Sequence, residues 1–180
     1  MHRIAKFEKV SYEQFKKDWL DTFAQRYYDL DAEYVDKTIR KIYDSIKLPK
    51  RATTGSAGYD FFSPYPFTIN IAEVVKIPTG IRCSMESGWV LNVYPRSGHG
   101  FKYGISMANT VGVIDQDYYG SDNEGHIFIK LVNDSVLAKT FDIKSGEAFC
   151  QGIFTPYGIT VDDEATEIRN GGFGSTSQKS

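Results

Sequence analysis

The chain has 180 residues, and 24% of them are charged, for a formal net charge of −2. Such a near-neutral charge argues against a protein that mainly binds nucleic acid or an anionic membrane surface. No apolar stretch approaches the roughly 20 residues that span a bilayer, and the N-terminus lacks the apolar stretch of a signal peptide. The length predicts one domain, residues 1–180. Two isolated cysteines, Cys83 and Cys150, fit a reducing compartment better than a disulfide, so we expect a cytoplasmic protein with no nucleic-acid or membrane partner.

The first 48 residues contain no glycine and no proline, whereas all 16 glycines and all six prolines follow them. Residues 3–10 partly alternate polar and apolar side chains, which predicts a first strand over residues 1–10. Ser11 and Gln14 then have the spacing of a helix-capping box. Apolar residues recur at helical spacing in two stretches, first Phe15, Trp19, Phe23 and Tyr27, then Val35, Ile39, Ile42 and Ile46. Residues 11–47 are therefore predicted to form a helical hairpin, which either packs on the neighbouring domain or serves as a lid or partner surface.

Residues 48–168 show the pattern of an all-β domain. Short apolar runs at 74–78, 80–83, 89–94, 126–132 and 148–154 alternate with glycine, proline and asparagine. Many short strands at this spacing predict a sandwich, a jelly roll or a barrel. Residues 169–180 carry little apolar surface with which to build a core, so they are predicted to be a flexible C-terminal arm.

General nucleotide-binding and hydrolase motifs are missing from the sequence. There is no GxxxxGK[ST] loop, no GxGxxG after a strand and no GxSxG turn, and the three histidines lack metal-ligand spacing. What remains is a set of five polar or glycine-rich segments between the predicted strands: 55–60 (GSAGYD), 95–98 (PRSG), 109–118 (NTVGVIDQDY), 146–151 (GEAFCQ) and 169–176 (RNGGFGST). Each segment taken singly is explained by a turn or a bulge.

In this order, the five segments resemble the five motifs of the trimeric dUTPase family, over about residues 49–177. The resemblance implies a mainly β, antiparallel jelly-roll (β-clip) fold, here with an added helical hairpin near the N-terminus. It also implies a homotrimer with shared active sites, which uses Mg²⁺ to hydrolyse dUTP to dUMP and pyrophosphate by water attack at the α-phosphate. Two alternatives stay open: a related dCTP deaminase or bifunctional enzyme, and a regulatory protein of this fold that binds a partner through residues 11–47.

The resemblance also assigns roles to single residues. Asp115 matches the carboxylate that activates the attacking water, which needs a base within hydrogen-bond reach. Tyr118 matches the ring that packs on the deoxyribose. Asn109 matches the group that recognises uracil, helped by the backbone of Val113 and Ile114 in an expected hairpin between Asn109 and Asp115.

The remaining matches concern the phosphates and the metal. Phosphate contacts are expected from Arg96, Ser97 and Gly98 and, in the fifth motif, from Arg169, Gly174, Ser175 and Thr176, with Phe173 stacked on uracil. Mg²⁺ usually binds through substrate phosphates and keeps several waters. We therefore expect no direct protein ligand, with Asp60 and Gln151 as supporting groups.

The sequence departs from the family pattern in four places. The helical stretch 11–47 replaces a short connection. Residues 121–125 look like an insertion after the third motif, which we interpret as an acidic turn. His99 stands where the family usually has leucine. Arg169, which the resemblance assigns to the γ-phosphate, lies four residues before Phe173 rather than the usual five.

Overall fold

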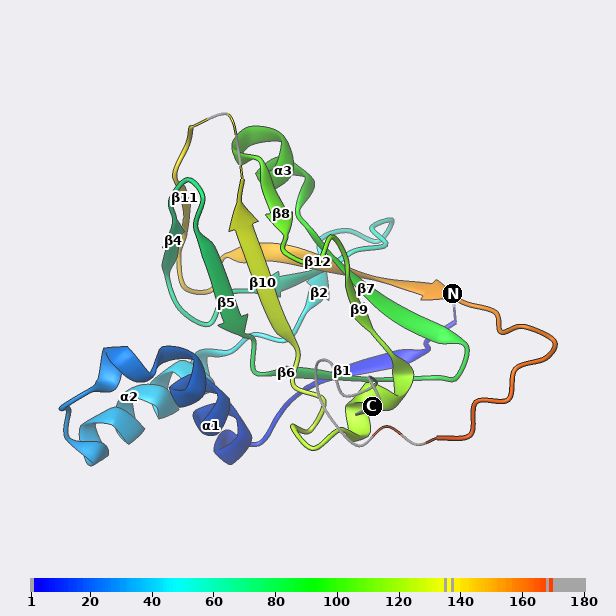
Figure 1. The fold of residues 1–180 in the computed structure, drawn as a ribbon, viewed down its shortest axis with the longest axis horizontal. Helices are drawn as coiled ribbons and strands as arrows, with labels where there is room; N and C mark the ends of the chain where they lie inside the picture. The colour runs from blue at the N-terminus through cyan, green and yellow to red at the C-terminus, as the bar shows by residue number, and fades with distance from the viewer. Residues whose placement is uncertain (1, 135, 137, 168, 170–180) are drawn as a thin grey trace, which may run out of the picture.

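The computed structural model describes residues 2–134, 136, 138–167 and 169. It is mainly β and antiparallel, as expected (Figure 1). Five strands form the largest sheet, in the order β2-β3-β12-β7-β9: β2 (Lys50–Arg51), β3 (Tyr59–Phe62), β12 (Ala148–Pro156), β7 (Trp89–Pro95) and β9 (Gly112–Ile114). A second sheet has the order β5-β10-β8: β5 (Val74–Pro78), β10 (Phe128–Asn133) and β8 (Ile105–Met107). Two pairs complete the fold: β1 (Ala5–Lys9) with β6 (Ile81–Met85), and β4 (Phe67–Ile69) with β11 (Phe141–Ile143).

Several of the predicted apolar runs form strands that bury alternate side chains. In β6, for example, Ile81, Cys83 and Met85 are buried and the residues between them are not. The first strand is shorter than predicted, because only Ala5–Lys9 pair with β6. Both cysteines are buried free thiols, so the expectation of unpaired cysteines is confirmed.

Residues 11–47 form the predicted helical hairpin. It consists of α1 (Tyr12–Phe23), a 3-10 turn η1 (Ala24–Tyr27) and α2 (Ala32–Ser45), and Figure 1 shows these helices at the opposite end of the molecule from α3 (Ser97–Tyr103). A further 3-10 turn, η2, covers Gln116–Gly120. No helix among the described residues is long and apolar enough to cross a membrane.

The apolar stripe of the hairpin packs into the same buried cluster as the strands. Phe15 and Trp19 of α1 are almost fully buried, and the Trp19 ring packs edge-on against Tyr65 with 5.0 Å between centroids. Gly80 allows the closest approach: its φ is +73°, and a Cβ there would lie 2.3 Å from Cδ1 of Ile46. Such an approach requires glycine. The hairpin is thus docked on the strands, as the packing interpretation expects.

Candidate functional site

The first, second and fourth motifs meet at one end of β7. Gln151 of β12 lies between Asp60 of β3 and Tyr94 of β7, which are its partners in the two neighbouring ladders. Arg96 follows β7, and its Nε lies 3.1 Å from Oδ1 of Asp60. Ser97, the first residue of α3, follows Arg96. The same region therefore holds the Arg96 guanidinium, the Asp60 carboxylate, the Gln151 amide and the Ser97 hydroxyl. This phosphate cluster (Asp60, Arg96, Ser97 and Gln151) combines three of the five predicted motifs.

A cavity of about 550 Å³ opens beside the phosphate cluster. It is lined by Tyr94, Pro95, Arg96, Ser97, Gly100, Phe101, Ile105 and Gln151. Gln151 Nε2 donates a hydrogen bond to the carbonyl of Pro95 at 3.2 Å, which leaves its oxygen on the side of Gly58. A Cβ at Gly58 would lie 2.5 Å from that oxygen, so the first motif needs a glycine there for this Gln151 position. Gly98 is the second residue of α3 and follows Ser97.

The third motif forms a second cluster around the end of β9. Asp115 follows β9 directly, and its side chain is 50% exposed. Asn109 and Val113 are exposed as well, whereas the Ile114 side chain is buried, so only the backbone of Ile114 is available to a nucleotide. The predicted hairpin between Asn109 and Asp115 is instead a turn between two sheets. Thr110, with φ +66°, donates its N–H to the Met107 carbonyl, but β8 pairs with β10 and β9 pairs with β7.

The two clusters lie at opposite ends of β7. Ile114 pairs with Leu91, so Asp115 lies level with Val90, six residues before Arg96. Six residues of strand span about 20 Å. A single nucleotide cannot place its α-phosphate at Asp115 and its neighbouring phosphates at Arg96 across that distance. Within one chain, therefore, the two clusters cannot act on the same substrate molecule.

Arg169, from the predicted C-terminal arm, contacts the third motif. Its Nη2 donates to Oδ2 of Asp115 at 2.5 Å, and its Nε donates to Oδ1 of Asp117 at 2.9 Å. The guanidinium carbon lies 5.8 Å from the centre of the Tyr118 ring. The arm's cation thus neutralises the carboxylate that is assigned to water activation. Phe173, Gly174, Ser175 and Thr176 lie outside the described residues.

Tyr118 is only 4% exposed, which is more burial than contact with a substrate alone would require. Its hydroxyl donates to the backbone carbonyl of His126 at 2.7 Å and accepts from Nδ2 of Asn123 at 2.9 Å. Burial raises the pKa of Tyr118, so the hydroxyl stays protonated and remains a donor. The hydrogen bonds of the Tyr118 hydroxyl with residues 123–126 therefore fix the position of the ring.

His126, at the end of that loop, is fully buried between α1 and the strands. Its Nε2 accepts the Gly80 N–H at 2.8 Å, so its proton lies on Nδ1, which donates to Oδ2 of Asp18 at 2.5 Å. Burial lowers the pKa of His126, which keeps the ring neutral. Burial alone would raise the pKa of Asp18, but hydrogen bonds from His126 and Gln14 outweigh it and lower that pKa. Motif spacing gives no signal for this pair, because 108 residues separate its members.

We expect the neutral state of His126 to make stability depend on pH. Below the ordinary histidine pKa of about 6.5, the unfolded chain binds a proton that folded His126 does not. The free energy of unfolding should therefore fall by about 1 kcal/mol between pH 7.5 and pH 5.5 through this residue. Asp18 and Glu124 also face His126, but their pKa values are lowered from about 4, below this window.

Urea unfolding at the two pH values and one fixed protein concentration measures this effect. The matched pair is His126→Gln and His2→Gln, since His2 is exposed. The His2 variant should keep the pH dependence of the wild type, and the His126 variant should lose about 1 kcal/mol of it. Equal pH dependence in all three proteins would contradict the assignment. His99, whose pKa burial also lowers, accounts for pH dependence that remains in the His126 variant.

The residues present fit a metal that is held mainly by substrate. Among the described residues, no group of three or more His, Cys, Asp or Glu side chains is arranged to hold a metal ion. Asp60 and Gln151 nevertheless bring a carboxylate and an amide oxygen to paired positions on neighbouring strands. Oxygen donors of this kind suit Mg²⁺ and its waters.

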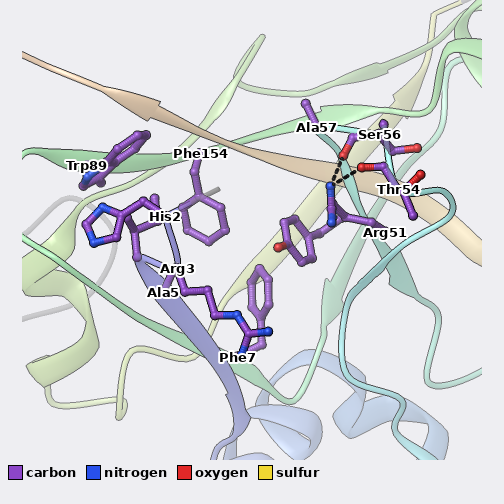
Figure 2. A pocket seen from close by; sticks show the side chains of 13 residues that line it. His2, Arg3, Ala5, Phe7, Arg51, Thr54, Ser56, Ala57, Trp89 and Phe154 are labelled. Atoms are coloured by element: carbon purple, nitrogen blue, oxygen red, sulfur yellow. Dashed lines mark hydrogen bonds between the residues drawn. The ribbon is translucent and has the colours of Figure 1, made fainter.

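A larger cavity, of about 790 Å³, lies elsewhere, beside β1 (Figure 2). Phe7, Trp89 and Phe154 line it, and across from them Arg51 Nη1 donates to the carbonyls of Thr54 and Ser56. Neither Arg96 nor Asp115 reaches this cavity. The motif residues, and not the cavity volume, therefore define the candidate site.

Comparisons with a family profile, with related sequences and with solved structures all identify the same family. The sequence profile of the dUTPase family matches residues 44–177. A deoxyuridine 5'-triphosphate nucleotidohydrolase from Lactococcus lactis is 42% identical over 134 residues, which are 73% of this chain and 88% of that protein. The enzyme of the same name from Dictyoglomus turgidum is 37% identical over 147 residues, 77% of this chain and 95% of that protein.

Solved structures agree. The dUTPase from Streptococcus mutans superposes with a TM-score of 0.57 at 38% identity, covering 65% of this chain and 90% of that one. A dUTPase from phage phi11 of Staphylococcus aureus, described with a structural Mg(II) ion, also gives a TM-score of 0.57. It covers 71% of this chain and 95% of that one, and its 21% identity shows the fold alone. The family profile begins at residue 44, after most of the helical hairpin.

Proposed function

The chain belongs to the dUTPase family and hydrolyses dUTP to dUMP, and we propose that its two clusters divide this reaction between them. Asp115 accepts a proton from the attacking water, while the phosphate cluster holds the triphosphate. The observation that carries the proposal is the convergence of Asp60, Arg96 and Gln151 from three motifs, with Asp115 exposed at the end of β9.

The bond changes define what each group must do. The water oxygen forms a bond to the α-phosphorus, and the bond from that phosphorus to the bridging oxygen of the β-phosphate breaks, so pyrophosphate leaves. The proton of the water passes to Asp115. Because a carboxylate is a weak base, much of the rate comes from holding one water in line with the leaving group.

The phosphate cluster balances the charge of the substrate. The planar guanidinium of Arg96 suits two phosphate oxygens at once, and the Ser97 hydroxyl donates to a third, with the Gly98 backbone beside them. Mg²⁺ carried by the triphosphate would offset negative charge in the transition state. Asp60 and the side-chain oxygen of Gln151 would accept hydrogen bonds from waters bound to the ion.

The third motif selects the nucleoside. The amide of Asn109 both donates and accepts, as the edge of uracil does, and the backbone of Val113 and Ile114 completes the contact. The Tyr118 ring packs on the deoxyribose and offers a 2'-hydroxyl neither room nor a partner, which penalises UTP.

The active site is shared between chains of a homotrimer. The separation of about 20 Å along β7 supports this, because Asp115 of one chain and Arg96 of another can meet where Asp115 and Arg96 of one chain cannot. The C-terminal arm closes the site: Phe173 stacks on uracil, and Gly174, Ser175 and Thr176 contact the phosphates. Arg169 leaves Asp115 for a phosphate when the nucleotide binds.

Pyrophosphate release from dUTP in the presence of Mg²⁺ tests the proposed reaction. The purified protein should release one pyrophosphate per dUMP formed, and EDTA should abolish turnover, since the triphosphate then lacks its counter-charge. Ammonia release from dCTP should stay at the level of a protein-free control. Absence of pyrophosphate, or release of ammonia, would contradict the assignment.

Two further predictions remain part of the proposal. A cytoplasmic location is supported by the buried free thiols of Cys83 and Cys150. A protein partner at residues 11–47 would use the outer surface of the hairpin, where Tyr28, Leu30 and Tyr34 are exposed.

A further inference from the structure

The two segments that depart from the family pattern, residues 11–47 and 121–125, contact each other. Glu124 accepts hydrogen bonds from the backbone N–H of Ser11 at 2.7 Å and from the Ser11 hydroxyl at 2.6 Å. The Ser11 hydroxyl accepts from the N–H of Gln14, as the capping box predicts, but the Gln14 side chain donates to Asp18 instead of returning to Ser11. Glu124 thus supplies, from a distant loop, the second half of the cap of α1.

A second contact lies two helical turns further along α1. Asp18 accepts from His126, and the Phe15 ring lies 6.1 Å from the His126 ring. Residues 11, 15 and 18 share one face of a helix, because they are spaced by four and three. One face of α1 therefore contacts both Glu124, through Ser11, and His126, through Asp18.

The loop between Tyr118 and His126 is itself tightly closed. The Tyr118 hydroxyl donates to the His126 carbonyl, and Asn123 donates to the Tyr118 hydroxyl. Gly125, with φ +70°, packs so closely that a Cβ would lie 2.7 Å from Cα of Tyr119. Such a loop moves as a unit, so a shift of His126 carries the hydroxyl end of Tyr118 with it.

We propose that α1 is a positioning element for Tyr118, and that Asp18 and His126 are positioning residues that set the discrimination between dUTP and UTP. The chain of contacts runs from Asp18 to the His126 imidazole, from the His126 carbonyl to the Tyr118 hydroxyl, and through the ring to the sugar. Both nitrogens of His126 are used, one by Gly80 and one by Asp18, which fixes the ring in one orientation. The inference rests on the proposed contact between Tyr118 and the deoxyribose.

The test compares kcat/KM for dUTP with kcat/KM for UTP in variants of α1. Asp18→Ala removes the acceptor of the His126 N–H and should lower the dUTP preference about tenfold, because small misplacements of a positioning group have effects of this size. Asp18→Asn keeps an oxygen acceptor for the neutral imidazole and should stay within about twofold of the wild type. Asp21→Ala is the matched control: Asp21 lies on the same helix, largely exposed, and its ion-pair partner is Lys76 at 3.9 Å. Its preference should equal that of the wild type.

The outcomes separate this inference from the proposed function. If Tyr118→Leu lowers the dUTP preference but Asp18→Ala does not, the coupling through α1 is wrong and the role of Tyr118 stands. If Tyr118→Leu leaves the preference unchanged, the sugar contact itself is wrong, and the inference falls with it. A loss of stability in Asp18→Ala without a change in preference would show a purely structural role and overturn the proposal.

A second variant covers the case in which Asp18→Ala does not fold. Glu124→Ala breaks the other contact between α1 and the loop while leaving His126 and Asp18 in place. It should lower the dUTP preference in the same direction, by about threefold. An unchanged preference in folded Glu124→Ala would overturn the proposal.

Discussion

Asp115→Asn should lower kcat for dUTP hydrolysis by about a thousandfold, because the amide cannot accept the proton of the attacking water. KM should change little, since the phosphate cluster and the uracil contacts are untouched. The side chain is half exposed and follows β9 on the surface, so the substitution should leave the fold and the assembly intact. Steady-state kinetics with dUTP and Mg²⁺ measure the effect.

Asp122→Asn is the matched control for this experiment. Asp122 is an exposed carboxylate in the loop that follows η2, only seven residues further along the chain. Its substitution changes the net charge by the same amount and should keep kcat within about twofold of the wild type, as surface substitutions usually do. Full activity in Asp115→Asn, or an equal loss in both variants, would show that Asp115 is not the base.

The local elements were largely predictable because their signals are local. The helical spacing from Phe15 to Tyr27 and the Ser11 cap predicted α1, and the short apolar run at residues 74–78 matches β5. The order of the five motifs predicted the family, which the comparisons confirm over residues 44–177.

What the sequence could not predict depends on pairing between distant segments. The turn at Asn109 looked like a hairpin, yet β8 and β9 pair with strands of two different sheets. Glu124 looked like part of an acidic turn, and its partner Ser11 is 113 residues away. Periodicity reports which face of an element is buried, but not which other element buries it.

For the site, too, the residues were predictable but their relative positions were not. Resemblance named Asp115, Arg96 and Gln151, and the structure joins Arg96 and Gln151 in one cluster. The separation of Asp115 from that cluster depends on the register of β9 on β7, which no motif encodes. His126 and Asp18 carry no motif either, and their contact with the site appears only through the fold.

Mixing two inactive variants should restore dUTP hydrolysis if the active site is shared between chains. Asp115→Asn chains keep the phosphate cluster, and Arg96→Ala chains keep the base. In randomly mixed trimers, about a quarter of the sites combine an intact Asp115 with an intact Arg96 from the neighbouring chain. The mixture should therefore regain about a quarter of wild-type activity, although each variant alone is nearly inactive.

A second mixture sharpens this test of the shared site. Wild-type chains mixed equally with chains that carry both substitutions should retain about a quarter of full activity if sites are shared, and about a half if each chain holds its own site. Shared sites predict recovery in the first mixture and a quarter of full activity in the second. No recovery in the first mixture, together with half of full activity in the second, would contradict a shared site.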